Sequence, residues 1–543
     1  MSGPSVSLLA GLLILLPALL WGAGTEQAIT VQPPGITIAL DTEPPNLNSL
    51  RATDQVSFFI LGHVGEGLLR HDQRHGLVGG VAESWSITAD TARFTLRSDA
   101  RWSDGRPVTA HDFVHAWRMA LDPATASEYA FILYPIQHAR EINHGQRPPT
   151  ALGVRAPDDR TLEVTLAGPC GYFASLTAFA TYFPVRADFH RARGERYAAD
   201  AGDLLFNGPF RLARWVHGAH LRLEKNPHYW DRNSIRLHAI DIPYITTDPS
   251  TRFNLFRDGK IALTGLDADS LREAMRHRLR IRRFADGSVF FLEFNHRPER
   301  PTANRHLREA MRLVYDPEEL VDKVIGVPGT LATFSLFPHW LRGLQGTFQE
   351  EYPAPVIPVD PIAARDHLRQ ALAELGLAHP PPLTLLTGDN PASARQAEYL
   401  QHLYAKRLGL ELRIDKQTFK QRLARMTAGQ FDLVTAGWGP DFDDPITFGD
   451  LFASWNANNR GRFVDQDYDH WVTVARDSAD PRVRLPAFGR LQAILSREVA
   501  IIPQYERGLI YIQHPRLKGV VRRIFGADPD YSRAWVAESV VAE

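Results

Sequence analysis

A chain of 543 residues is too long to fold around one hydrophobic core, because single cores stop growing at about 250–300 residues. We therefore expect two or three domains. Hydrophobic residues make up 44% of the chain and charged residues 23%, which is typical of globular proteins and gives no sign of disorder. The formal net charge of −1 provides no strong field that would attract nucleic acid or an acidic membrane surface, so neither partner is expected.

Short alternating patterns predict a mixed α/β fold. Runs in which apolar and polar residues alternate predict strands at 35–40, 93–97 and 162–166. Helix signals lie between such runs: Asp360 and Pro361 open an amphipathic segment that Gly376 ends. Thr109 and Asp112 have the form of a capping box, with Asp in place of Glu, ahead of another helix.

The first 24 residues have the features of a secretory signal peptide. An apolar run from Val6 to Leu20 contains the helix breaker Pro17, and small residues follow at 22–24, where a signal peptidase would cut. The run is too short to predict a membrane-spanning helix, although an uncleaved anchor is the alternative. No cysteine follows it to carry a lipid, so we expect a soluble protein exported to the periplasm of a two-membrane bacterium.

Cys170 is the only cysteine, which excludes an internal disulfide and a cysteine-based zinc or iron–sulfur site. No base stands near it in 168–172, so a small buried residue is expected there rather than a nucleophile. The chain also lacks the serine-hydrolase elbow and the phosphate-binding loop of nucleotide hydrolases. We expect no cofactor and no hydrolysis of nucleotides by this chain.

The most informative tract for function begins with the apolar strand 431–434 and ends in three acids, Asp441, Asp443 and Asp444. A carboxylate at the end of such a strand, if shielded from water, suits the capture of a cationic head such as the amine of a peptide. A helix cap or a solvated acid is the plain alternative for Asp441. The tract favours a receptor for a small ligand.

An enzyme is the competing class of function. His111 and His115 lie four residues apart, as in zinc proteases, so both would share one face of a helix. Asp112 stands where those enzymes have a catalytic Glu, and no third ligand follows at a fixed spacing. A metal-dependent hydrolase therefore remains the less favoured alternative, and we expect a protein that is not an enzyme.

Several segments together resemble the extracytoplasmic peptide-binding proteins of ABC transporters, the oligopeptide and dipeptide receptor family 5. The resemblance covers nearly all of the chain after the signal segment. Its segments are 65–69 (GEGLL), 81–85 (VAESW), 94–97 (FTLR), 102–113 (WSDGRPVTAHDF), 162–166 (LEVTL), 207–210 (NGPF) and 224–230 (EKNPHYW).

The resemblance implies an α/β periplasmic-binding-protein (Venus-flytrap) fold with two lobes and an additional inserted domain. Its boundaries would give lobe I from 25–65, 187–287 and 508–543, an inserted domain from 66–186, and a closing lobe from 288–507. A short peptide would be held between the lobes, and the protein would deliver it, as a monomer, to the permease subunits of an ABC transporter.

In that family the ligand backbone is bound as an added strand between two extended segments. By position these are Thr53, Asp54 and Gln55 on one side and the backbone of Gly437, Trp438 and Gly439 on the other. The resemblance places the amine anchor at Asp441, while Asp443 and Asp444 would tune its field or cap the next helix. The side chain of Trp438 has core packing as its alternative role.

Side-chain pockets are implied at Phe419 and Tyr129, both of which could also be core aromatics. The chain departs from the oligopeptide branch at Thr435 and Ser393, where the family has an Arg and a His for the ligand carboxylate. Arg425 or Arg297 could substitute. A non-peptide amino compound as ligand, or a role in peptide sensing, remains open at this point.

Overall fold

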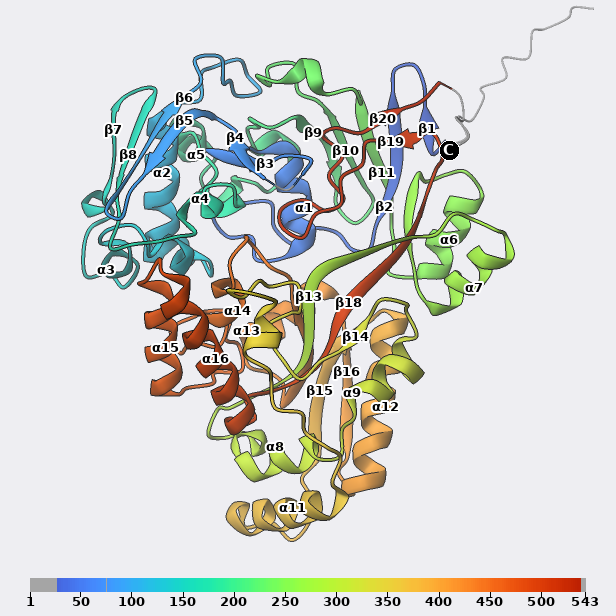
Figure 1. Ribbon diagram of the computed structural model, residues 1–543. Coiled ribbons are helices and arrows are strands. Elements are labelled where there is room, and N and C mark those ends of the chain that lie inside the picture. Colours follow the sequence, from blue (N-terminus) through green and yellow to red (C-terminus); the bar gives the residue numbers. More distant parts are fainter. Residues whose placement is uncertain (1–26, 75, 539–543) are drawn as a thin grey trace, which may run out of the picture.

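Three larger β-sheets organise the chain into an upper and a lower lobe in the computed structural model, which describes residues 27–74 and 76–538 (Figure 1). The upper lobe contains a five-stranded sheet with the order β1-β2-β11-β10-β9 and a four-stranded antiparallel sheet with the order β5-β6-β8-β7. The lower lobe is built on a seven-stranded mixed sheet with the order β12-β18-β13-β17-β15-β16, in which β14 also pairs with β18. The expected mixed α/β class is confirmed.

The elements of the upper lobe, in sheet and chain order, are β1 (Ile29–Thr30), β2 (Gly35–Leu40), β11 (Ala239–Ile245), β10 (His220–Lys225), β9 (Phe210–Val216), β5 (Ala82–Ile87), β6 (Thr91–Leu96), β8 (Thr161–Thr165), β7 (Val154–Asp158), β3 (Leu69–His71), β4 (Leu77–Gly79), β19 (Leu517–Lys518), β20 (Trp535–Val536), α1 (Gln55–Val64), α2 (Ala110–Leu121), α3 (Ala139–Asn143), α4 (Phe173–Leu176), α5 (Ala187–Arg193), α6 (Pro249–Arg257) and α7 (Ala268–Arg276).

β12 (Leu263–Leu266) pairs with β18 and packs against β2, α6 and α7 of the upper lobe. The elements of the lower lobe are β13 (Arg282–Phe294), β14 (Leu331–Ala332), β15 (Leu383–Gly388), β16 (Leu412–Gln417), β17 (Leu433–Trp438), β18 (Ile501–Gln513), α8 (Arg305–Arg312), α9 (Pro317–Glu319), α10 (Phe348–Glu351), α11 (Pro361–Leu375), α12 (Pro391–Leu408), α13 (Phe419–Thr427), α14 (Ile446–Gly449), α15 (Gln466–Arg476) and α16 (Pro481–Glu498).

The helices and strands that local sequence patterns predict are present in the structure. Asp360 caps α11 by accepting hydrogen bonds from two backbone N–H groups, and Gly376 ends the helix at φ 67°, a left-handed conformation that favours glycine. Thr109 and Asp112 form the expected capping box of α2. The three predicted strands correspond to β2, β6 and β8.

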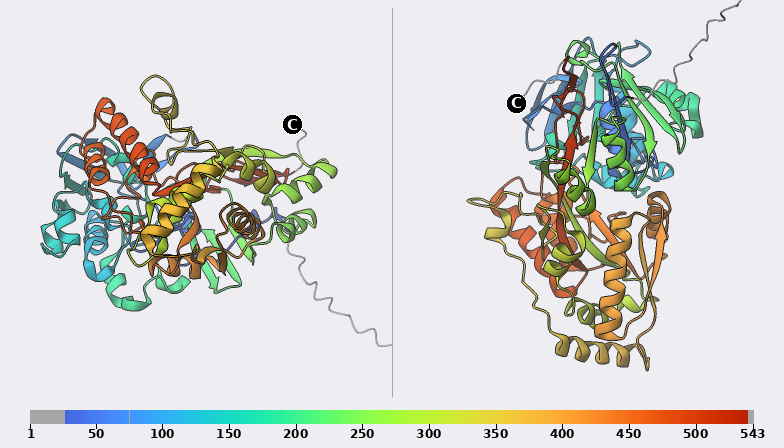
Figure 2. Two further views of the ribbon diagram at one scale, coloured as in Figure 1. Left: turned by 90° about the horizontal axis from the view of Figure 1, so that it is seen from below. Right: turned by 90° about the vertical axis from the view of Figure 1, so that its right-hand side faces the viewer.

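Two long strands connect the lobes. β13 and β18 have 13 residues each, pair antiparallel, and run from the upper lobe into the lower one (Figures 1 and 2). Their register shifts between Ala285 and Val289, and Gly287 lies inside this interval at φ 76°. A shift of this kind marks a bulge, where a strand bends most easily.

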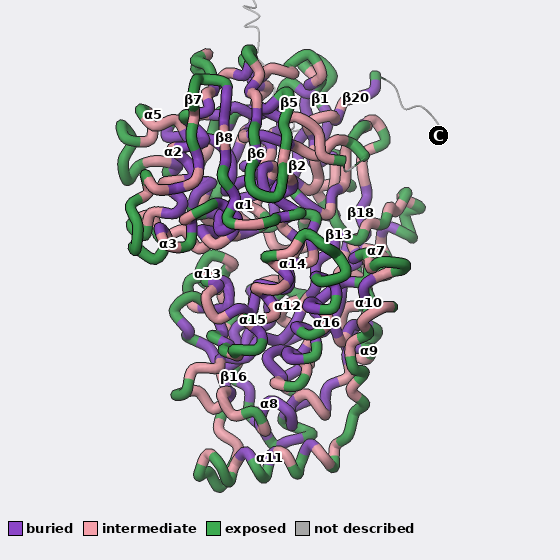
Figure 3. Tube along the Cα trace, turned by 60° about the vertical axis from the view of Figure 1, so that its left-hand side comes forward, coloured by how far each residue is buried: buried purple, intermediate pink, exposed green. Residues whose placement is uncertain are grey.

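Apolar packing occupies the interior of both lobes. One cluster of buried side chains extends through the upper lobe and the contact between lobes, and another lies around β15, β17 and α12. Figure 3 shows these buried stretches, while α11 at the far end is mostly intermediate or exposed and buries chiefly Ala364, Leu368 and Ala371. Cys170 is buried, as expected, and burial raises the pKa of its thiol to about 12.

None of the helices in the described part of the chain is long and apolar enough to cross a membrane. The predicted signal peptide, residues 1–24, lies outside the described residues. The division into lobe I, inserted domain and closing lobe at the boundaries that the resemblance implies stays a prediction.

Candidate ligand-binding cleft

A cavity of about 460 Å³ lies between the two lobes. Its upper wall includes Gln55, Phe58 and Phe179, and its lower wall includes Pro440 and Asp441. Ligand cavities in proteins typically measure about 300–1,000 Å³ and combine apolar walls with a few polar groups. The volume and the mixed lining both suit a small organic ligand.

Asp441 reaches this cavity because β17 ends just before it. Leu433 and Val434 are fully buried, so β17 is a central strand that fixes the position of the residues directly after it. After Trp438 the chain turns, and the Asp441 N–H donates to Thr447 Oγ1 at 3.1 Å. The carboxylate is thereby held at the end of a rigid strand and faces the upper lobe.

Burial dominates the electrostatics of Asp441. It raises the pKa of this carboxyl from 3.8 to about 7, and the hydrogen bond that Tyr129 donates to Oδ2 at 3.0 Å opposes the shift. Burial and the neighbouring Asp441 charge also raise the pKa of Asp450 well above its usual value. The site therefore holds an acid with a pKa of about 7 together with a second acid whose pKa is also raised.

Contacts across the cleft hold the lobes together in this structure. Tyr129 of the upper lobe stacks on Trp438 of the lower lobe, with ring centroids 6.3 Å apart and an interplanar angle of 10°. The adjacent Glu128 forms an ion pair with Arg460 at 2.9 Å, also between lobes. The two lobes are thus closed on each other in this structure. Tyr129 contacts the lower lobe twice, through its ring on Trp438 and through its hydroxyl on Asp441.

One edge of β17 is open after its pairing with β15 ends. The N–H of Asn295 donates to the carbonyl oxygen of Asp432 at 2.9 Å, so even-numbered positions of β17 face β13. The N–H and C=O groups of Thr435 and Gly437 therefore point to the opposite edge. β15 pairs with that edge only as far as Val434 among the described residues, and the carbonyl oxygen of Thr435 accepts a hydrogen bond from Arg422. The backbone at Gly437 can accept another strand.

The segment 53–55 faces this edge at the start of α1. Asp54 caps the helix, since its carboxylate accepts from Ser57 N at 2.9 Å and Ser57 Oγ at 2.7 Å. Gln55 lies so close to Gly439 that a Cβ on this glycine would collide with its amide. Thr53 is half-buried. The two predicted segments are neighbours, and the side chain of Asp54 is engaged within its own helix.

The remaining predicted side chains lie around α13. Phe419 begins this helix and is half-buried, with the Arg422 guanidinium 5.4 Å from its ring centroid. Arg425 is held by Asp415 at 2.6 Å, and Arg297 donates to Asn295 Oδ1 and to the carbonyl of Arg460. Both proposed substitutes for the missing carboxylate-binding Arg are therefore already engaged.

Ser393 and Thr435, which stand at the family's carboxylate-binding positions, have structural partners. The N–H of Ser393 donates to Asn390, the cap of α12, and Thr435 Oγ1 lies 3.0 Å from Thr387 Oγ1. Neither side chain carries a charge that could bind a carboxylate.

The other two acids of the tract differ in their surroundings. Asp443 is exposed, whereas Asp444 is buried in a bidentate ion pair with Arg484 and also accepts from the N–H of Ile446. Asp444 therefore contributes to the cap of α14, as expected, but its main partner is Arg484. Sequence reasoning missed Arg484, Arg460 and Asp450, because no local pattern links them to this tract.

The metal-site alternative is not supported. His115 Nε2 lies 3.3 Å from His190 Nδ1, and burial with the neighbouring His190 lowers the pKa of His115 to about 4. His111 lies beside Asp159 on the exposed surface of α2. Within 27–74 and 76–538, no three His, Cys, Asp or Glu side chains are grouped so that they could hold a metal ion.

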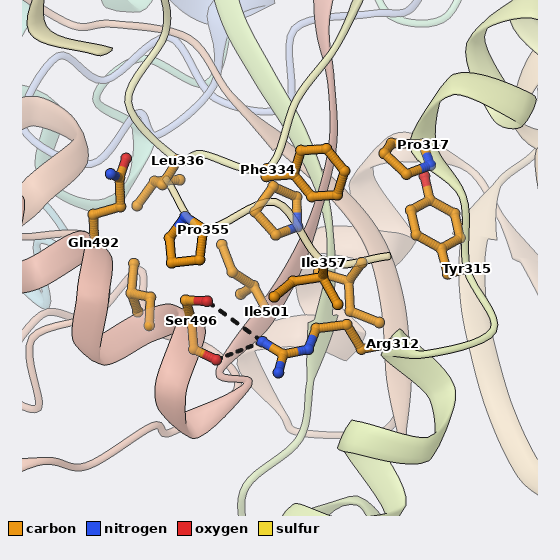
Figure 4. A pocket seen from close by; sticks show the side chains of 13 residues that line it. Arg312, Tyr315, Pro317, Phe334, Leu336, Pro355, Ile357, Gln492, Ser496 and Ile501 are labelled. Atoms are coloured by element: carbon orange, nitrogen blue, oxygen red, sulfur yellow. Dashed lines mark hydrogen bonds between the residues drawn. The ribbon is translucent and has the colours of Figure 1, made fainter. Parts of the chain in front are cut away.

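A second cavity lies in the lower lobe (Figure 4). Its volume is only about 30 Å³, which is room for about one water molecule. Arg312, which lines it, donates to the carbonyl oxygen of Ser496 at 2.6 Å. Apolar side chains such as Leu336, Pro355 and Ile357 form much of the wall. This cavity is too small for an organic ligand.

Two lobes joined by two strands, with a buried acid and an open strand edge at the cavity between them, define a two-lobed ligand-binding protein. The family model described as bacterial extracellular solute-binding proteins, family 5 (Middle), matches residues 76–460. The chain belongs to this family, and it is accordingly a solute-binding protein and not an enzyme. The expected Venus-flytrap class is confirmed.

Relatives and solved structures agree with this assignment. The chain is 28% identical to the dipeptide-binding protein DppE of Bacillus subtilis over 90% of this chain and 89% of that protein. The substrate-binding domain of an oligopeptide ABC transporter from Bacillus anthracis superposes with a TM-score of 0.89 and 32% identity, covering 94% of this chain and all of the other. Listeria monocytogenes OppA bound to peptide has a TM-score of 0.87 and 30% identity, covering 93% and 99%.

Proposed function

We propose that this protein captures short peptides in the cleft between its lobes and delivers them to an ABC permease for uptake. The observation that carries the proposal is the position of Asp441, a half-buried acid without a cationic partner among the described residues, which lines the cavity just after a strand with a free edge. A peptide amine would complete the ion pair. The names of DppE and of peptide-bound OppA support the same class of ligand.

The ligand backbone would lie as an extra strand beside β17. The open edge presents the N–H and C=O of Gly437, and Gly439 follows directly after the strand ends at Trp438. Backbone hydrogen bonds of this kind do not depend on the ligand side chains, so a range of peptides would bind. Thr53 to Gln55 would line the opposite side.

The proposal extends to location and partners. Signal peptide cleavage after residue 24 would release a soluble monomer into the periplasm, where the closed lobes would be recognised by the permease. Closure would be driven by contacts that form only between lobes and ligand, because a ligand shifts a conformational equilibrium only through such differential contacts. A non-peptide amino ligand or a sensing role is not favoured by the relatives.

The test is calorimetric titration of the purified protein with a pool of short peptides and with the same pool N-acetylated. We expect the free-amine pool to bind at least about a hundredfold more tightly, because an unpaired buried charge costs about 3 kcal/mol. Asp441→Asn should abolish this preference, while Asp443→Asn, the exposed acid two positions on, should keep it. Equal binding of both pools by the wild type would refute amine capture.

A further inference from the structure

Arg422 stands where the open edge of β17 begins. It is on α13, and its Nη1 donates to the carbonyl oxygen of Thr435 at 2.9 Å. Thr435 and Gly437 share this edge, because backbone groups on one side of a strand recur every two residues, and Gly439 follows directly after the end of the strand at Trp438. Arg422 and Asp441 therefore mark the two ends of the proposed ligand strand.

The charge of Arg422 has no counter-ion within the described residues. Its Nε is buried without a hydrogen-bond partner there, and no ion pair forms with any described acid. Burial and the neighbouring Arg460 lower the pKa of Arg422, whereas Asp389 and Tyr505 favour its charged form from positions where they do not bond to it. The side chain is half-buried, and taking a cation out of water without an opposite charge costs free energy, which an anionic ligand at this position would offset.

Neighbouring arginines show the contrast. Arg425, one turn further along α13, is paired with Asp415 at 2.6 Å, and Arg460 is paired with Glu128 at 2.9 Å. Arg507, which lines the inter-lobe cavity, is paired with Asp286. Each of these cations is already neutralised by a carboxylate of the chain, whereas Arg422, beside the open edge, has no such carboxylate among the described residues.

We propose that Arg422 binds the C-terminal carboxylate of the peptide, and this rests on the proposed function. The ligand amine at Asp441 fixes the direction: the peptide runs antiparallel to β17, from Gly439 back to Thr435. Four residues separate these two positions, which is about 13 Å at a strand rise of about 3.3 Å per residue. A peptide of three or four residues spans this length, and its carboxylate then meets the planar guanidinium, which is suited to bidentate recognition.

The experiment measures the affinity for alanine peptides of two to six residues, each with a free amine, as the free acid and as the C-terminal amide. For the wild type we expect the acid to bind at least about tenfold more tightly than the amide at three or four residues, and this ratio to be smaller at five and six residues. Arg422→Gln should reduce the affinity for the acid to that for the amide and leave the amide nearly unchanged. Arg422→Lys should restore part of the ratio, and Arg425→Gln should leave it intact.

Two results would overturn the inference. An unchanged acid-to-amide ratio in Arg422→Gln would show that another group binds the carboxylate. Equal losses for acid and amide would show that Arg422 only fixes α13 to β17. If the variant does not fold, the wild-type peptide series is sufficient as a test. An acid-to-amide affinity ratio near one at every peptide length would refute the binding of the carboxylate by Arg422. Failure of amine capture is distinguished by N-acetylated peptides: if they bind as tightly as the free amines and still show an acid-to-amide ratio that depends on Arg422, amine capture is refuted and carboxylate binding by Arg422 stands.

Discussion

The pKa of Asp441, raised to about 7, makes peptide affinity depend on pH in a calculable way. A neutral carboxyl cannot pair with the peptide amine, so binding requires the ionised form. In the ligand-free protein about half of the molecules carry the carboxylate at pH 7 and about 1% at pH 5, which predicts about fiftyfold weaker binding at pH 5. Above about pH 8 the peptide amine, with a pKa near 8, loses its own charge, so affinity should be highest between about pH 7 and 8.

The direction of the pH dependence follows from whether Asp441 is protonated in the ligand-free protein or in the peptide complex. Burial makes the ligand-free site keep its proton up to about pH 7, whereas the bound ammonium favours the carboxylate, so binding below pH 7 releases a proton. Tyr129 faces the acid and remains neutral throughout, because burial and Asp441 both raise its pKa well above 10. Burial and the charge of Asp441 raise the pKa of Asp450 well above its usual value.

Calorimetry of a free-amine tripeptide between pH 5 and 8 is the assay, in pairs of buffers with different ionisation enthalpies at constant ionic strength. The wild type should show the loss of affinity at low pH and a proton release near pH 6, and Asp443→Asn should behave alike. Asp441→Asn should bind weakly with no such dependence. If the folded wild type binds equally at pH 5 and pH 7 without releasing a proton, the assignment of Asp441 is wrong.

Three further predictions concern the contacts around this acid. Tyr129→Phe removes a hydrogen bond that lowers the pKa of Asp441, so affinity at pH 7 should fall about tenfold and the pH midpoint of binding should rise; an unmoved midpoint in calorimetry would contradict this. Glu128→Gln removes the ion pair to Arg460 across the cleft, so peptide dissociation measured by stopped-flow tryptophan fluorescence should accelerate by up to about fivefold, and an unaltered rate would count against a role in closure. Asp444→Asn leaves Arg484 buried without its counter-ion, which should lower the free energy of unfolding by about 3 kcal/mol in denaturant titrations. Asp443→Asn, at an exposed position, should change the free energy of unfolding by less than about 0.5 kcal/mol. Similar unfolding midpoints for the two variants would refute the structural role of Asp444.

Local features of the fold could be predicted from the sequence because short-range physics determines them. The capping box at Thr109 and the glycine stop at Gly376 both involve groups within one turn of a helix. The strand predicted at 431–434 was recognisable from the apolar Phe431, Leu433 and Val434, although β17 begins at Leu433 and continues to Trp438. These signals identify elements, and the resemblance to a family supplied how they assemble.

Partners from distant parts of the chain could not be predicted in this way. The hydrogen bond between Tyr129 and Asp441 exists only once the two lobes close, and the ion pair between Asp444 and Arg484 exists only once the lower lobe has folded. Arg425 and Arg422 lie on the same helix, three positions apart, and the sequence offers no reason to prefer one of them. Only the structure shows that Asp415 already neutralises Arg425.

The bulge in the two connecting strands has a consequence for affinity itself. Because β13 and β18 belong to both lobes, closing must bend this ribbon where its register shifts, around Gly287. A Cβ at Gly287 would press against Ile524 and Trp340, so a side chain there would change the elastic cost of closing without touching the ligand. The apparent affinity equals the affinity of the closed state scaled by how often that state is populated. A residue in the hinge can therefore set how tightly every peptide is held, by the same factor for all of them, while the cleft alone decides which peptides are preferred.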